Sequence, residues 1–394
     1  MPDTPIYLDN HATTPLDPRV LDAMLPYLRE HFGNPGSVQH AFGRSAATAV
    51  EAARADVAAL IGAEPREIVF TSGATESNNL AIKGAARFRR GERSRIVTLA
   101  TEHKCVLESA RALERDGFSV TILDVARDGL VDLDSLDRAV DARTALVSVM
   151  AAQNEIGVLQ PLDKISAICR ARGAWLHTDA AQAVGKVSID VAAQGIDLLS
   201  ISGHKLYGPK GIGALYVRRR PRVRLEPLFD GGGQERGFRS GTLAPALCVG
   251  LGSACAIAGA EMAAEAARLR SLRDRLWQAL SAARPDLAIN GNPDRRLPGN
   301  LNLRLPGIDA NKLMAALPDI AISSGSACMA AEIEPSYVLR ALGLSDAEAA
   351  SSVRIGLGRF TTAAEIDRAA KRLIEAARAQ AKDAAQVSGR AGER

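Results

Sequence analysis

The sequence has few cysteines, little net charge and no long apolar run, and each shortage excludes a class of protein. Its five cysteines form no CxxC pair and no regular framework, which argues against structural disulfides and favours a reducing, cytoplasmic setting. A formal net charge of +4 is too small to make nucleic acid the expected partner. No apolar run reaches membrane-spanning length, and residues 1–10 lack the basic-then-apolar order of a signal peptide. We therefore expect a soluble protein with no membrane partner and no direct nucleic-acid partner.

Lysine is also scarce, because only nine of the 49 basic residues are lysines and the others are arginines. Lys205 follows a short apolar run, in the segment Ser202-Gly203-His204-Lys205, and a glycine–proline loop comes after it. A lysine beside histidine and serine at the mouth of a sheet suggests an amine that forms an imine, rather than a solvated surface charge.

Alternating helix and strand patterns run along most of the 394 residues. Short apolar segments flanked by polar turns or helices are typical of a buried, mostly parallel sheet, so we predict an α/β fold. A helix is expected over 44–61, a long helix over 261–283 bridges two domains, and a closing helix covers 363–381 before a frayed tail at 386–394. The predicted strands are 67–70, 96–99, 120–123, 145–149, 174–178, 198–201 and 212–217, with further strand signals at 300–305 and 353–357.

The segment Thr71-Ser72-Gly73-Ala74-Thr75-Glu76 follows one of these strands and opens a helix. Free backbone N–H groups and the positive helix end make such a turn a phosphate cradle, and hydroxyls add donors. The alternative is an ordinary strand-to-helix turn with a serine or threonine cap.

Asp179 ends another buried strand, and Gln182 lies one helical turn further on. A buried carboxylate needs a cationic partner, such as a protonated heterocycle, although Asp is also a common helix cap. Together, an imine-forming lysine, a carboxylate for a ring nitrogen and a phosphate cradle specify pyridoxal 5'-phosphate.

Two further polar segments follow strands and should reach the same edge of the sheet. His103 can stack on a cofactor ring and move protons, because histidine titrates near neutrality; the alternative is a structural histidine. Asn154 can bind a substrate carboxylate or the cofactor hydroxyl.

Cys328 is the cysteine that lies outside any packing pattern, after the small residues Ser323-Ser324-Gly325-Ser326-Ala327. Cys169, Cys248 and Cys255 lie in apolar helical segments and are interpreted as buried, whereas Cys105 is ambiguous because it is close to His103. An accessible thiol on an expected mobile loop, near pyridoxal phosphate, suggests sulfur transfer.

From Tyr7 to about Phe360 the sequence resembles the class I, housekeeping (IscS/NifS-like) cysteine desulfurases, within the fold-type-I, class V aminotransferase superfamily. Many motifs occur in the same order. They include Ala12-Thr13-Thr14-Pro15, Phe70-Thr71-Ser72-Gly73-Ala74-Thr75-Glu76-Ser77, Thr101-Glu102-His103, Asn154-Glu155-Ile156-Gly157, Asp179-Ala180-Ala181-Gln182, Ser202-Gly203-His204-Lys205, Arg239-Ser240-Gly241-Thr242 and Ser323-Ser324-Gly325-Ser326-Ala327-Cys328.

The resemblance implies a large domain over 16–262, with a mostly parallel seven-stranded sheet between helices. It implies a smaller α+β domain over 1–15 and 263–394 that carries Cys328. It also implies a homodimer in the cytoplasm that converts L-cysteine to L-alanine and leaves a persulfide on Cys328 for an acceptor protein in iron–sulfur assembly or thiolation. No metal site is expected.

The resemblance also assigns roles to individual residues. Lys205 carries pyridoxal phosphate covalently and later moves the α-proton, and His103 stacks on the ring and handles protons. Asn154 and Arg354 hold the substrate carboxylate, although Arg354 alternatively forms a buried structural ion pair. The cofactor-binding residues implied are Ala74, Thr75, His103, Asn154, Asp179, Gln182, Ser202, His204, Lys205 and, toward the other subunit's phosphate, Thr242.

Two departures leave the sulfur acceptor open. The sequence after Thr361 lacks the Trp-containing tail of housekeeping members, where a scaffold protein docks, and Met329-Ala330-Ala331-Glu332 replaces the usual Ser/Thr-rich sequence. An iron–sulfur scaffold is thus only one candidate acceptor. The alternative functions are a selenocysteine lyase or cystine C–S lyase of the same superfamily, in which Cys328 need not be the nucleophile, and a non-catalytic scaffold protein.

Overall fold

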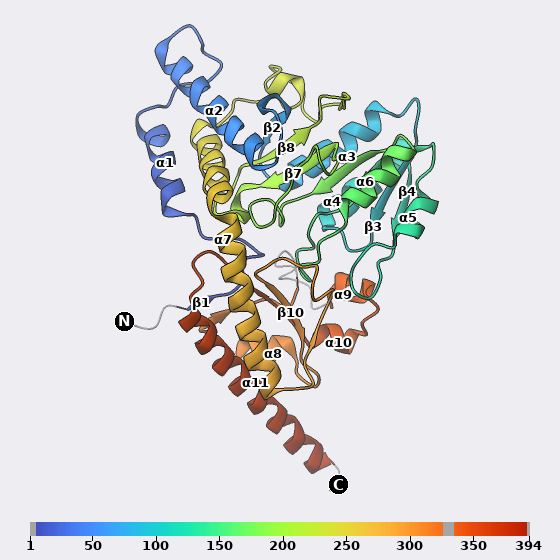
Figure 1. The fold of residues 1–394 in the computed structure, drawn as a ribbon, viewed down its shortest axis with the longest axis vertical. Coiled ribbons are helices and arrows are strands. Elements are labelled where there is room, and N and C mark those ends of the chain that lie inside the picture. The colour runs from blue at the N-terminus through green and yellow to red at the C-terminus, as the bar shows by residue number, and fades with distance from the viewer. Residues whose placement is uncertain (1–4, 326–334, 392–394) are drawn as a thin grey trace.

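The computed structural model describes residues 5–325 and 335–391, except for the side chains of residues 383–391. Cys328 lies outside the described residues. A large sheet with helices on both faces forms one part of the molecule, and a small sheet with the last helices forms the other (Figure 1). The helix α7 (Pro245–Ala283) runs through both parts.

The large sheet confirms the predicted fold class, and all seven predicted strands are present within one residue of their expected ends. β8 runs antiparallel to both of its neighbours, and every other neighbouring pair is parallel. Strands that run the same way end at one edge of a sheet, so the residues that follow them are brought together there. In spatial order the strands are β2 (Ile68–Thr71), β8 (Gly213–Val217), β7 (Leu198–Ser202), β6 (Trp175–Asp179), β5 (Thr144–Ser148), β3 (Arg95–Leu99) and β4 (Ser119–Leu123).

Two apolar cores cover the faces of this sheet. One contains side chains of α3 (Ala74–Phe88) and α4 (Lys104–Ala112). The other contains side chains of α2 (Ala41–Leu60), α5 (Leu133–Ala139), α6 (Leu162–Ala171) and the first half of α7. The remaining helices here are α1 (Pro18–Arg29) and the short 3-10 helices η1 (Pro65–Glu67), η2 (Leu113–Asp116), η3 (Gly203–Lys205) and η4 (Glu235–Gly237).

α7 corrects two expectations from the sequence. It begins at Pro245 rather than at residue 261. The sequence pattern did not reveal its first half, because that half is rich in alanine and glycine and lacks a polar face. By length and composition alone this helix is also long and apolar enough to cross a membrane, so the expectation of no such apolar run was wrong. Its first half instead packs so closely on α2 that a Cβ at Gly252 would lie 2.6 Å from Cα of Ala53.

The small part has a core of its own, built from leucines of the second half of α7 and from its own sheet. In that sheet β10 (Asn300–Arg304) pairs antiparallel with β12 (Ser352–Gly356) and with β9 (Ala288–Ile289). The N-terminal strand β1 (Ile6–Tyr7) joins this part by pairing with β11 (Ile320–Ala321). The domain boundaries drawn at residues 15 and 262 stay a prediction.

The remaining helices of the small part are short except for the last. They are α8 (Ala310–Ala315), α9 (Tyr337–Ala341), α10 (Asp346–Ala350) and α11 (Ala363–Ala391). α11 is longer than predicted, since its backbone stays helical through residues 386–391, where we expected fraying. Alanine, glutamine and lysine in this helix are strong helix formers.

Candidate active site

A cavity of about 420 Å³ opens at the edge where the parallel strands end. Of the twelve site residues predicted from the sequence, ten line this cavity. Two do not: Thr242 is exposed and lies outside the cavity lining, and Cys328 is outside the described residues. The ten are Ala74, Thr75, His103, Asn154, Asp179, Gln182, Ser202, His204, Lys205 and Arg354.

Lys205 is held at the cavity by the N-terminal segment of the chain. The residue ends η3, directly after β7, and its Nζ donates to the carbonyl oxygens of His11 (2.5 Å) and Ala12 (2.6 Å). The two carbonyls orient the amine in a polar setting. An amine presented in this way can form an imine with a carbonyl compound.

Asp179 has the environment that a protonated ring nitrogen requires. The residue is 5% exposed at the end of β6, where Oδ2 accepts from Asn78 Nδ2 (2.7 Å) and Oδ1 accepts from the backbone N–H of Ala181 (2.9 Å). Within residues 5–325 and 335–391 it makes no ion pair. A buried carboxylate with two hydrogen bonds but no cation fits the pyridinium nitrogen of pyridoxal phosphate.

The N-terminus of α3 has the geometry of a phosphate cradle. Gly73 takes the N-cap position with φ +149° and ψ −179°, a conformation that only glycine adopts readily, and no side chain of the described residues caps the first turn. The turn is fixed from behind, since Glu76 Oε2 accepts from the backbone N–H of Ser72 (2.8 Å). Its uncapped N–H groups and the positive helix end therefore suit a phosphate group.

His204 and Ser202 flank the same cradle from the end of β7. His204 Nδ1 lies 3.0 Å from Thr13 Oγ1. Burial, together with the nearby cations Lys205 and Lys210, lowers the pKa of His204 to about 4. His204 is thus neutral at pH 7 and can serve a phosphate as a hydrogen-bond donor.

His103 begins α4 and caps it with its own ring. Nδ1 accepts from the backbone N–H of Cys105 (3.2 Å) and lies 3.0 Å from the Cys105 sulfur. An accepting Nδ1 requires the proton of a neutral ring to be on Nε2. The ambiguous Cys105 is therefore a neighbour of the catalytic candidate, and it also lines the cavity.

Arg354 is the largest fully buried side chain, at 1% exposure, and it enters the cavity from β12. Nη2 donates to Asp9 Oδ1 (2.8 Å), and Nη1 donates to the carbonyl oxygen of Asn154 (3.2 Å). Its Nε is buried without a hydrogen-bond partner among the described residues. The guanidinium thus keeps N–H groups for a carboxylate in the cavity.

Two buried carboxyl groups lie directly behind these residues. Burial raises the pKa of Glu102 well above its usual value, and Asp179 raises it further. Burial also raises the pKa of Glu155, which accepts from Ser336 Oγ (2.5 Å). Asp179 is one of the charges that raise the pKa of Glu102, so the carboxyl groups of Asp179 and Glu102 lie close enough to interact.

Sequence reasoning missed several residues that line the cavity. His11 was missed although it follows the short apolar segment 6–8, because a two-residue strand carries little signal. Lys210 follows the predicted loop and was overlooked beside Lys205. Among the described residues, no group of three or more histidine, cysteine, aspartate or glutamate side chains has the arrangement of a metal site.

Comparisons with known proteins agree with this geometry. The family described as "Aminotransferase class-V" matches residues 6–369. A Homo sapiens protein named "Cysteine desulfurase" is 56% identical over 371 residues, which cover 94% of this chain and 81% of that protein. "Cysteine desulfurase IscS" of Rickettsia bellii (strain OSU 85-389) is 55% identical over 367 residues, covering 93% and 90%. A solved structure described as "NIFS-LIKE PROTEIN" matches with a TM-score of 0.88 at 36% identity, covering 94% of this chain and 99% of that one.

Proposed function

The chain belongs to the class V aminotransferase family and is a cysteine desulfurase, an enzyme that uses pyridoxal phosphate, and from this premise we propose the roles of its residues. The observation that carries the proposal is the single cavity that brings together Lys205, Asp179 and His103. The three residues come from three different strand ends, and each has the chemistry that its role needs.

When bound, pyridoxal phosphate supplies an electron sink for the bond-breaking steps at the α-carbon of L-cysteine. Asp179 holds the ring nitrogen in its protonated form, and the Gln182 amide donates to the ring hydroxyl. The N–H groups at the start of α3, together with Thr75, Ser202 and His204, hold the phosphate. These residues line one cavity with Lys205, so they would hold the cofactor beside its amine.

Lys205 moves a proton once substrate has taken its place. The His11 and Ala12 carbonyls hold Nζ within the cavity, so the free amine stays positioned to remove the α-proton and return one later. His103 lines the same cavity, which suits it to handle protons on the substrate. Arg354 and Asn154 orient the substrate through its carboxylate.

We propose that the Cys328 thiolate attacks the sulfur of bound L-cysteine. A new S–S bond forms on Cys328, the substrate's Cβ–S bond breaks, and its electron pair stays with Cβ. Protonation at Cβ then completes alanine. The overall change is L-cysteine plus the Cys328 thiol to L-alanine plus the Cys328 persulfide, so atoms and electrons balance without an added oxidant or reductant.

A homodimer is part of the proposal, and two surface features support it. Thr242 is exposed and outside its own cavity, as expected for a residue that reaches a partner subunit's phosphate. Near the projecting ends of α1 and α2 (Figure 1), Phe32 and Phe42 stack at 5.5 Å while 73% and 57% exposed. Exposed aromatic pairs of this kind suit a protein interface.

The persulfide is then passed to an acceptor protein, for which an iron–sulfur scaffold is one candidate. A cytoplasmic location is also proposed, supported by the free state of Cys105, Cys169, Cys248 and Cys255. Cys169, Cys248 and Cys255 are buried, as expected from the sequence.

Mass spectrometry of the protein after exposure to L-cysteine tests the proposal. We expect a gain of one sulfur atom on the peptide that contains Cys328, and we expect Cys328→Ala to lose both this gain and alanine release. If Cys328→Ala still releases alanine from L-cysteine at the wild-type rate, the persulfide mechanism is wrong and a lyase reaction replaces it. Cys169→Ala, which changes a buried thiol outside the cavity lining, is the matched control.

A further inference from the structure

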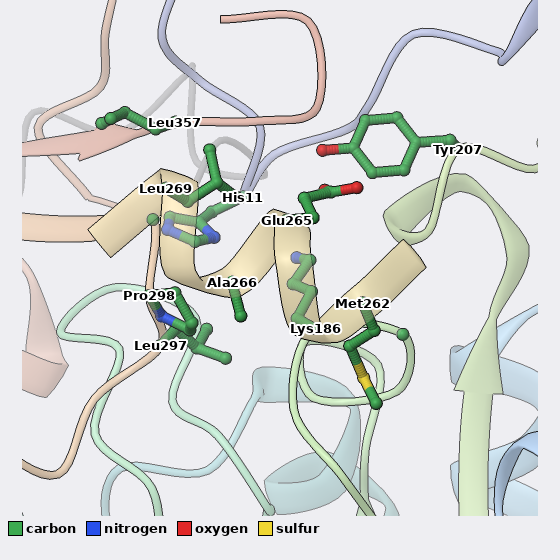
Figure 2. A pocket seen from close by; sticks show the side chains of 12 residues that line it. His11, Lys186, Tyr207, Met262, Glu265, Ala266, Leu269, Leu297, Pro298 and Leu357 are labelled. Atoms are coloured by element: carbon green, nitrogen blue, oxygen red, sulfur yellow. The ribbon is translucent and has the colours of Figure 1, made fainter. Parts of the chain in front are cut away.

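A second, narrow cavity lies behind the active site, between the two parts of the molecule. Its volume is about 20 Å³, room for one water molecule. Figure 2 shows the side chains of Lys186 and His11 turned toward it, with Glu265 from α7 beside them. His11 lines this cavity as well as the active-site cavity, so the two spaces are separated by little more than one residue.

Gln182 connects Lys186 to the active site. Its Oε1 accepts from Lys186 Nζ (2.9 Å) and lies 3.3 Å from His11 Nδ1, while its Nε2 donates to the His11 carbonyl oxygen (2.8 Å). A lysine ammonium can only donate, whereas a histidine ring nitrogen donates or accepts according to its tautomer. The Lys186 ammonium, which only donates, and the His11 carbonyl, which only accepts, therefore together determine which end of the Gln182 amide is the oxygen.

The orientation of this amide matters on the cavity side. Nε2 carries two hydrogens, of which one serves the His11 carbonyl and the other is left for an acceptor. The ionised ring hydroxyl of pyridoxal phosphate is such an acceptor. Had the amide turned over, its carbonyl oxygen would face this negative oxygen and repel it.

We propose that Lys186 is a positioning residue for the cofactor, which acts by holding the Gln182 amide with its N–H toward the active site. The inference rests on the proposed function, because it concerns the same cofactor. It adds a residue that touches neither the cofactor nor the substrate.

The surroundings of Lys186 make this control sensitive to pH. In the cofactor-free protein, desolvation, together with the nearby positive charges of Lys205 and Arg354, lowers the pKa of Lys186 to about 7, against the opposing effect of Glu265. Glu265 is itself engaged by Arg359 Nε (2.8 Å). As pH rises, Lys186 loses its charge and holds the amide oxygen less firmly. The charged and titratable groups around it are Lys205, Glu265, His11, His204, Arg354, Tyr207 and Arg359.

Four variants of the holoenzyme test the proposal: Lys186→Met, Lys186→Arg, Gln182→Leu and the double variant Lys186→Met with Gln182→Leu. The visible absorption band of bound pyridoxal phosphate is recorded against pH without substrate, and kcat and KM for L-cysteine are measured separately. We expect Lys186→Met to shift the pH midpoint of the band and to lower kcat about tenfold, equivalent to about 1.4 kcal/mol. Lys186→Arg keeps a charged donor and should restore most of both.

The double variant separates positioning from a general structural effect. If Lys186 acts through Gln182, adding Lys186→Met to Gln182→Leu should leave the midpoint unchanged. A further shift in that background, equal to the shift in the wild type, would overturn the proposal. Cofactor content and the unfolding temperature show that each variant folds, and Lys164→Met, at an exposed lysine on α6, is the control for loss of a lysine.

The outcome is separable from a failure of the proposed function. If the wild type released no alanine from L-cysteine, the proposed reaction would be wrong. The band measured without substrate would still report whether Lys186 controls the cofactor through Gln182.

Discussion

Arg354→Lys offers a quantitative test of substrate binding, because the hydrogen bonds of Arg354 can be counted. An arginine has five N–H donors. One Nη2 donor is used by Asp9 and one Nη1 donor by the Asn154 carbonyl, whereas Nε has no partner among the described residues. Three donors therefore remain, enough for a carboxylate to accept two hydrogen bonds side by side.

A lysine at this position has three donors on one nitrogen. If Asp9 and the Asn154 carbonyl keep two of them, only one is left for the substrate carboxylate. The variant thus loses one charge-assisted hydrogen bond, worth about 1.5–3 kcal/mol. This loss corresponds to a rise of about 10- to 150-fold in KM for L-cysteine, with a smaller change in kcat because the carboxylate is bound equally before and during the reaction.

Steady-state release of alanine measures both constants, and cofactor content shows that the fold is retained. Arg268→Lys is the matched control, since Arg268 donates to the backbone carbonyls of Gly358, Arg359 and Thr361 and does not line the cavity. An unchanged KM in a folded Arg354→Lys protein would refute the reasoning, and Arg354 would then serve only its ion pair with Asp9.

Two further predictions concern the phosphate cradle. His204 has a pKa of about 4 in the folded protein and about 6.5 when unfolded, so the unfolded state binds more protons between these pH values. The cofactor-free protein should therefore lose stability as pH falls from 6.5 to 4. Urea unfolding at several pH values measures this loss, which should be smaller in His204→Gln. Gly73→Ala should weaken pyridoxal phosphate binding or the stability of the fold by about 1–3 kcal/mol, because alanine does not readily adopt φ +149°. Titration of the cofactor-free protein with pyridoxal phosphate measures the loss of affinity. An equal loss of affinity in Gly91→Ala, at a surface turn of ordinary conformation, would contradict this cause.

Local pattern explains why so much of the fold was predictable. Each strand of the large sheet is a short apolar run with polar turns on both sides, and parallel strands bring their following residues to one edge. Asp179 and Lys205 could therefore be placed at one edge of the sheet from the strand pattern, whereas the role of Ser202 came from the family resemblance. The apolar periodicity did not reveal the first half of α7. Alanine and glycine occur on all faces of the helix there, so no amphipathic stripe appears before residue 261.

Contacts between segments far apart in the chain could not be predicted from the sequence. Lys205 is anchored by His11, which lies 194 residues earlier, and Arg354 pairs with Asp9, 345 residues earlier. Neither partner lies in a segment with a recognisable period, since β1 has only two residues. The role of Lys186 was missed for the same reason, because it depends on a cavity that exists only when the two parts meet.

The position of the N-terminal segment has a consequence for synthesis on the ribosome. β1 has no partner until β11 has been made, and Asp9 also bridges to Gly356. The strands of the large sheet are complete by residue 217, long before these partners emerge. In a nascent chain, His11 and Ala12 can meet Lys205 once the large sheet is made, whereas β1 and Asp9 still wait for partners more than 300 positions later. The N-terminal segment is therefore placed in two stages, and the lining of the catalytic cavity is complete only after Arg354 has been made.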